Sequence, residues 1–84
     1  MYLASIIMSI APERTDRTVR LLDRIPQLSL YADEDEDVIV AVTETRNASE
    51  LRRLSAHIAK GVPGITALVP SYTDAGKRHI VPLK

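Results

Sequence analysis

The chain has 84 residues, no cysteine, and 11 Lys plus Arg against 11 Asp plus Glu. This length predicts one domain with a thin core, since a chain of this size buries only roughly 60% of its unfolded surface. The missing cysteines exclude disulfide scaffolds, thiolate metal sites and cysteine nucleophiles. The zero net charge gives no overall field that would attract nucleic acid or a membrane.

The first expected element is a strand over residues 2–10. This segment is mostly apolar, and Ser5 and Ser9 share one alternating face with Leu3 and Ile7. The segment is too short for a transmembrane helix and lacks the basic region of a secretion signal. We therefore expect a soluble protein without membrane insertion.

A helix is expected to open at Ala11-Pro12 and to end before Pro26. Proline fits the first helical turn because its missing N–H would have no partner there, and the residue before a proline avoids the helical region. The side chains at helical spacing form the stripe that should face the core. They are Thr15, Thr18, Val19, Leu22 and Ile25. A short second strand over residues 27–32 follows.

Five consecutive acids, Asp33 to Asp37, run directly into an apolar segment, residues 38–43. The acids cannot be buried unpaired, so they predict a solvated turn. They lack the glycine and the spaced ligands of an EF-hand loop, so we expect no metal there. The segment after them is apolar at nearly every position and rich in β-branched residues, which predicts a strand covered on both faces.

The second half repeats the plan of the first. Asn47, with Glu50 three residues on, predicts a capped helix start. Gly61 is expected to end this helix with a positive φ. The core-facing residues of this helix are Leu51, Leu54, Ser55 and Ile58. A strand over residues 65–72 follows, and then a basic tail.

The resulting order, β-α-β-β-α-β, predicts an α+β, ferredoxin-like fold over residues 1–73. Its four-stranded antiparallel sheet has two helices on one face. The first and third strands are expected in the middle and the other two at the edges. The tail, residues 74–84, is compatible with a short edge strand or with disorder.

The other face of this sheet also carries apolar side chains, so something is expected to cover it. The candidates are a second copy of the chain, the tail, or a partner peptide.

No pattern of a catalytic site is present. His57 is expected to be a partly exposed structural residue and His79 to be solvated. There is no Gly-rich phosphate loop and no serine–histidine–acid set. The middle strands carry only Tyr2 of the aromatics that the RNA-recognition version of this fold needs. These observations favour a binding module with no cofactor and no nucleic-acid partner, and not an enzyme.

Five segments and the apolar third strand, within about residues 3–73, together form a pattern known from one protein family. The five segments are Ala4-Ser5-Ile6-Ile7-Met8, Ala11-Pro12-Glu13-Arg14, Ile25-Pro26-Gln27-Leu28, Val62-Pro63-Gly64-Ile65 and Ala67-Leu68-Val69 leading to Tyr72. In these segments the chain resembles the NapD family of chaperones for periplasmic nitrate reductase. The resemblance implies a cytoplasmic chaperone, monomeric or homodimeric. Such a protein binds the twin-arginine signal peptide of a molybdenum-containing reductase and holds back export until the cofactor is loaded.

That peptide is basic at one end and apolar after it. The resemblance therefore implies two groups of binding residues. The residues implied to contact the apolar segment are Ser5, Ile7, Ile39, Ala41, Leu68 and Tyr72. The residues implied to face the arginines are Asp33, Glu34, Asp35, Glu36 and Asp37.

A second family, the ligand-binding domain of Lrp/AsnC regulators, is similar in its β-α-β-β-α-β order. Glu34–Asp37 echoes its usual Gly-x-x-Asp before the third strand, although the glycine is missing here, and Pro63-Gly64-Ile65 echoes its Pro-Gly-Val. This resemblance implies a stand-alone amino-acid-sensing domain that oligomerises through its sheet. An ACT-like metabolite sensor belongs to the same class.

Overall fold

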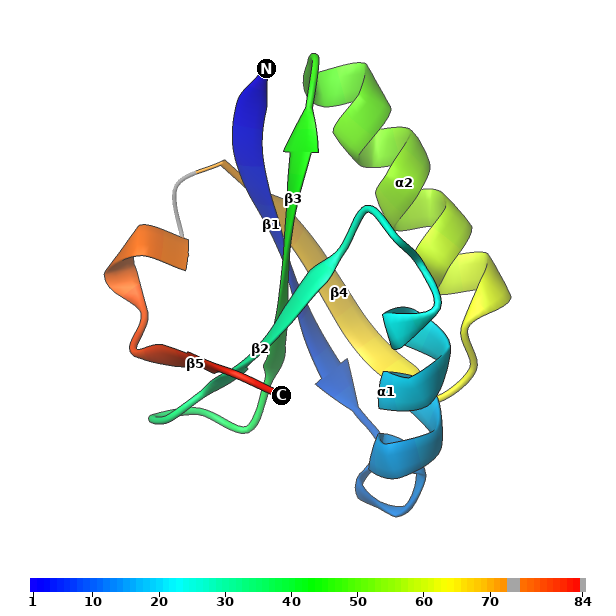
Figure 1. The fold of residues 1–84 in the computed structure, drawn as a ribbon. Helices are drawn as coiled ribbons and strands as arrows, with labels where there is room; N and C mark the ends of the chain where they lie inside the picture. The colour runs from blue at the N-terminus through cyan, green and yellow to red at the C-terminus, as the bar shows by residue number, and fades with distance from the viewer. Residues whose placement is uncertain (73–74, 84) are drawn as a thin grey trace.

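The computed structural model describes residues 1–72 and 75–83. Within them, two α-helices and five strands alternate with two short 3₁₀ helices (Figure 1). In chain order the elements are β1 (Tyr2–Ile10), η1 (Pro12–Arg14), α1 (Thr15–Asp23), β2 (Ser29–Asp33), β3 (Ile39–Thr45), α2 (Ala48–Gly61), β4 (Ile65–Ser71), η2 (Ala75–Lys77) and β5 (Ile80–Pro82).

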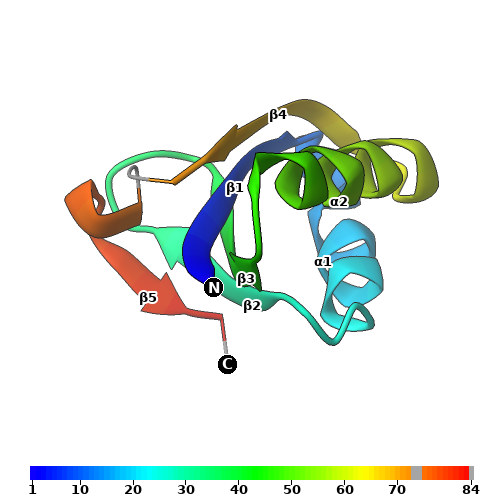
Figure 2. The same ribbon diagram turned by 90° about the horizontal axis from the view of Figure 1, so that it is seen from above.

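The described strands form one antiparallel sheet in the order β4-β1-β3-β2-β5. Both helices lie on one side of it (Figure 2). The fold is thus α+β and compatible with the ferredoxin-like plan, and the central position of β1 and β3 is confirmed. The expectation of four strands is wrong, because β5 from the tail pairs with β2. The edge strand on that side is therefore β5 and not β2.

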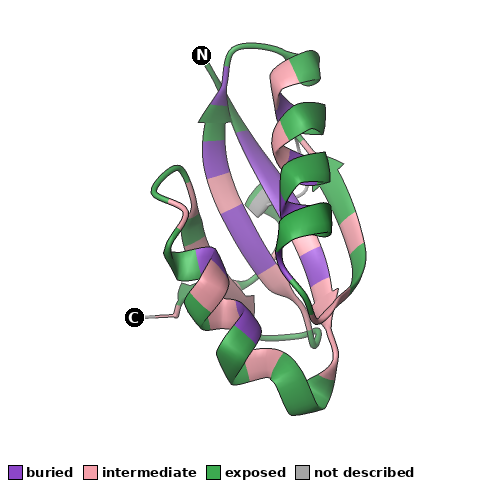
Figure 3. Cartoon of the chain, turned by 90° about the vertical axis from the view of Figure 1, so that its right-hand side faces the viewer, coloured by how far each residue is buried: buried purple, intermediate pink, exposed green. Residues whose placement is uncertain are grey.

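The core lies between the helices and the sheet. Fully buried residues of β1 meet buried residues of α1 and α2 there, and exposed positions line the outer side of α2 (Figure 3). The main core residues are Ala4, Ile6, Met8, Leu22, Ala41, Leu51 and Ile58. The expected core stripes of both helices are confirmed at Thr18 and Leu22 on α1 and at Leu51, Ser55 and Ile58 on α2.

Strand β3 is buried on both faces at its centre. Val40 and Ala41 are both 0% exposed, and successive residues of a strand point to opposite faces. Ala41 belongs to the core under the helices, so Val40 is buried on the other side. The prediction of a strand covered on both faces is confirmed.

Only some of the helix ends predicted from the sequence agree with the structure. The Asn47 side chain accepts a hydrogen bond from the Glu50 N–H at 2.9 Å, so the predicted cap is confirmed. The first turn after Pro12 is 3₁₀, and α1 itself begins at Thr15. The prediction for Gly61 is wrong, because α2 runs through it and the positive φ, 99°, occurs at Gly64 instead.

Candidate functional site

The tail crosses the sheet on the side away from the helices. The chain leaves β4 at one edge of the sheet and enters β5 at the other edge. Figure 2 shows η2 and β5 on the side opposite to α1 and α2. Val40 and Ser5 are buried on this side of the curled sheet. The sequence predicts that this face is covered by a second copy of the chain, by the tail or by a partner peptide. The structure shows the tail lying on it.

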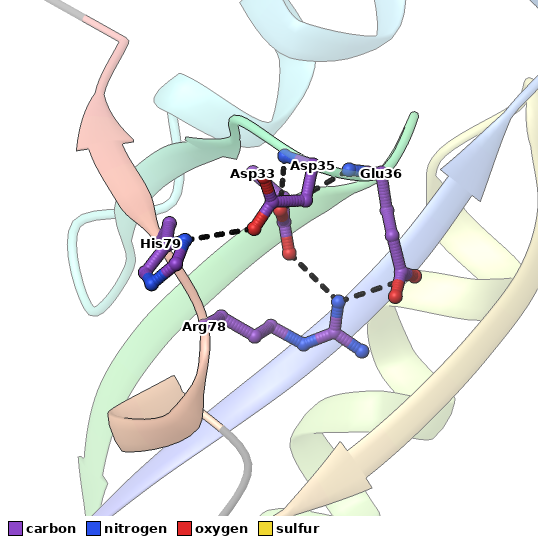
Figure 4. Close-up of polar contacts among 5 residues, drawn as sticks. All are labelled: Asp33, Asp35, Glu36, Arg78 and His79. Carbon is purple, nitrogen blue, oxygen red and sulfur yellow. Dashed lines mark hydrogen bonds and ion pairs between the residues drawn. The ribbon is translucent and has the colours of Figure 1, made fainter.

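The tail is held by the acidic turn, residues 33–37. The Arg78 Nη1 atom lies 2.8 Å from Asp33 Oδ2 and 3.4 Å from Glu36 Oε2 (Figure 4). His79 Nδ1 lies 2.8 Å from Asp35 Oδ2. The Asp33–Arg78 pair is the sheltered part of this cluster, with side chains 3% and 19% exposed. Both partners of the His79–Asp35 pair are largely exposed, so that contact is open to water and salt.

Asp33 has two separate roles in this turn. Its Oδ1 atom accepts hydrogen bonds from the N–H groups of Asp35 at 2.8 Å and of Glu36 at 3.2 Å. Its Oδ2 atom accepts from Arg78. The hydrogen bond from the Arg78 guanidinium, with help from the Asp35 N–H, holds the pKa of the Asp33 carboxyl below its ordinary value. The expectation of a wholly solvated turn is wrong for Asp33, because this carboxylate is paired rather than hydrated.

The residues after Arg78 continue as an extended strand along β2. Ala32 lies opposite Val81, and Asp33 lies opposite Ile80. The Glu34 N–H donates to the His79 carbonyl at 2.8 Å. The edge of β2 and the acidic turn thus bind a segment in which basic residues precede apolar ones.

Exposed apolar side chains remain on the same face of the sheet. Leu3 is 63% exposed and Val69 is 59% exposed. Val69 and the half-buried Ile7 are paired across β4 and β1, and with Arg78 they line an open hollow of about 320 Å³. A second hollow of about 390 Å³ lies beside Leu3. Apolar surface and the arginine-binding acids therefore share one side of the molecule.

The residues implied to contact an apolar segment do not all share this face. Ser5 and Ile7 are on it, Ser5 buried and Ile7 half-buried. The placement expected for Ile39, Ala41 and Leu68 is wrong, because their register turns them toward the helices and into the core. The side chains of their strand neighbours Val40, Val42 and Val69 point to the face away from the helices.

Tyr72 belongs to a different corner of the sheet. Its ring makes an edge-to-face contact with Tyr2 at 6.2 Å, and its hydroxyl lies 3.2 Å from Thr45 Oγ1. Sequence reasoning missed Leu3, Val69 and Arg78 as members of the site. Leu3 and Val69 could have been found by alternation from Ser5 and by strand pairing, but Arg78 carried no local signal.

Comparisons with protein-family models, with curated proteins and with solved structures found no match to this chain. Among residues 1–72 and 75–83, neither helix has the length and apolar character needed to cross a bilayer. Over the same residues, no three His, Cys, Asp or Glu side chains come together as a metal site would require.

Proposed function

We propose that this protein is a ferredoxin-like peptide-binding chaperone. Its ligand is a segment with arginine at one end and apolar residues after it, such as the twin-arginine signal peptide of a molybdenum-containing reductase. Binding would hold back export of that enzyme until its cofactor is loaded. The observation that carries the proposal is the doubly paired guanidinium of Arg78 on Asp33 and Glu36, beside an apolar sheet face.

The acidic turn supports an arginine ligand over a lysine ligand. It already holds one guanidinium, whose Nη1 atom faces both Asp33 and Glu36. A guanidinium is more weakly hydrated than an ammonium, so it is the better partner for a sheltered carboxylate such as Asp33. The turn is also prearranged, because Asp33 Oδ1 accepts from two backbone N–H groups. Little side-chain ordering is then left for binding, which favours affinity.

The apolar face supports the rest of the ligand. Leu3 and Val69 present large exposed apolar side chains, and Ile7 lies between Val69 on β4 and Val40 on β3. Exposed apolar patches of this kind mark sites of protein interaction. The excess of acid at one end of the patch would attract the basic end of the peptide and set its direction.

A labelled synthetic twin-arginine signal peptide tests the proposal by fluorescence anisotropy. We expect saturable one-to-one binding, weakened by salt because the arginine contacts are partly exposed. Val69→Asp should weaken binding by roughly tenfold or more, since it places a charge in the apolar contact. Ala59→Asp, on the exposed surface of α2, is the matched control and should leave the affinity unchanged.

Light scattering on the same samples separates this proposal from an oligomeric sensor domain. A monomer that becomes a one-to-one complex supports the chaperone. A stable dimer or octamer that ignores the peptide would overturn it. Equal affinity for a peptide with glutamine in place of both arginines would show that the acidic turn has no part in binding.

A further inference from the structure

The tail has the same chemical layout as the proposed ligand. Arg78 and His79 come first, and Ile80-Val81-Pro82-Leu83 follow as an extended apolar run. Arg78 fills the guanidinium position on Asp33 and Glu36. The apolar run pairs with the edge of β2. The protein thus holds, within its own chain, a segment of the kind that its acidic turn would select from outside.

We propose that residues 78–83 are an internal occupant of the peptide site and that the ligand binds by displacing them. This inference rests on the proposed function. In the exchange, an arginine of the ligand replaces Arg78 on Asp33, and an extended stretch of the ligand takes the place of β5 beside β2. Strand addition to an exposed sheet edge is a general mode of peptide binding, in which backbone hydrogen bonds give affinity and side chains give specificity.

The geometry makes β5 a replaceable strand. It has three residues, and its last, Pro82, has no N–H to donate. Val81 remains 40% exposed, so its apolar side chain is only partly buried. Strands β1 to β4 and both helices keep their core when β5 detaches, because no residue of β5 belongs to that core. A longer ligand strand with an N–H at every position would make more of the available hydrogen bonds.

An internal occupant lowers the apparent affinity of an external one. The tail is tethered, so its effective concentration at β2 is high, on the order of millimolar for a short link. The measured dissociation constant of the peptide is the intrinsic constant divided by the fraction of molecules in which the site is free. Holding the tail in place should therefore weaken peptide binding, and loosening it should strengthen binding.

A reversible disulfide between β2 and β5 tests this directly. Ala32 and Val81 are direct partners across the antiparallel pair. Such partners have Cα atoms about 4.5–5.5 Å apart, within the range that a disulfide spans. The chain has no cysteine of its own. The Ala32→Cys, Val81→Cys double variant can therefore form one bond that locks the tail, and dithiothreitol releases it.

We expect the oxidised double variant to bind the labelled twin-arginine peptide at least about tenfold more weakly than the same protein after reduction. The single variants Ala32→Cys and Val81→Cys are the controls, and their affinities should not respond to dithiothreitol. Equal affinity of the locked and released forms would overturn the displacement inference and leave the proposed function standing. Failure of every form to bind would overturn the proposed function, and the inference with it.

Arg78→Gln gives a second measurement that needs no disulfide. It removes the guanidinium that competes with the ligand, so peptide affinity should rise by about threefold or more. Arg52→Gln, on the exposed face of α2, is the matched control for the loss of one positive charge. An unchanged or lower affinity for Arg78→Gln, relative to this control, would contradict displacement.

Discussion

Thr18 and Gly64 are in contact across the two halves of the chain. The Thr18 hydroxyl donates a hydrogen bond to the Pro63 carbonyl at 2.9 Å, and a Cβ atom on Gly64 would collide with that hydroxyl. The Gly64 carbonyl in turn accepts from the Ala11 N–H at 2.9 Å. The start of α1 and the turn before β4 are therefore fixed against each other.

Gly64→Ala should lower the free energy of unfolding by about 1–3 kcal/mol, because an alanine would be strained at a φ of 99° and would press on Thr18. Urea denaturation measures this. Gly61→Ala is the matched control. Gly61 ends α2 with open space around it, so alanine there should leave stability unchanged or raise it by up to about 1 kcal/mol. Similar losses for both variants would contradict the role given to the Gly64 turn.

Asp33→Asn should change how the free energy of unfolding depends on pH at the acidic end. The pKa of Asp33 is lowered in the fold, so its pairing with Arg78 stabilises the native state above the unfolded pKa, near 3.9. That contribution is lost as the pH falls through the lower, folded pKa. Asparagine keeps the oxygen that accepts from Asp35 and Glu36 but removes the charge.

We therefore expect the unfolding free energy of the native protein to fall more steeply than that of Asp33→Asn below about pH 4. Denaturation curves at a series of pH values give this slope. Asp37→Asn, an exposed residue of the same turn, serves as the control and should follow the native protein. Parallel curves for all three proteins would show that the Arg78 pairing does not contribute to stability.

Asn47→Ala should destabilise the protein by about 0.5–2 kcal/mol, because the Glu50 N–H at the start of α2 loses its acceptor. Asn47→Asp keeps an acceptor at the same place and should stay close to the native stability. Thermal unfolding followed by circular dichroism measures both. A stable alanine variant would mean that water replaces the cap without loss.

Ser55→Ala should raise stability by about 1 kcal/mol. The Ser55 hydroxyl is buried against the sheet side of α2 and has no hydrogen-bond partner among the described residues. An unsatisfied buried polar group costs free energy, and alanine is the better helix former. Ser49→Ala, at an exposed position of the same helix, provides the comparison. A loss of stability in Ser55→Ala would indicate that the hydroxyl is hydrogen-bonded in solution.

The sequence predicted correctly those features of the fold that depend on a pattern within one short segment. The cap at Asn47, the helix stripes and the doubly buried centre of β3 all follow from local patterns, and the structure confirms them. The facing of Ile39 and Ala41 could not be predicted, because their neighbours Val40 and Val42 are equally apolar. Without polar alternation, a strand pattern does not reveal which side meets the helices.

The candidate site was less accessible to prediction than the fold. The acidic turn was visible as an isolated charge run, but its partner Arg78 lies 45 residues from Asp33. The pairing of β5 with β2 depends on that contact and on three residues of strand, which is too short for a clear pattern. The role of the chain as a peptide chaperone stays a prediction.

The position of β5 also has a consequence for local stability. In the described sheet β5 pairs with β2 alone, so it can detach without separating any other pair of strands. Proteins open in such units at free energies far below that of global unfolding. The amide hydrogens of Ile80, Val81 and Leu83 should therefore exchange with solvent much faster than those at the centre of β1 and β3. A melting temperature reports on the core, and the state of the tail needs a residue-level measurement.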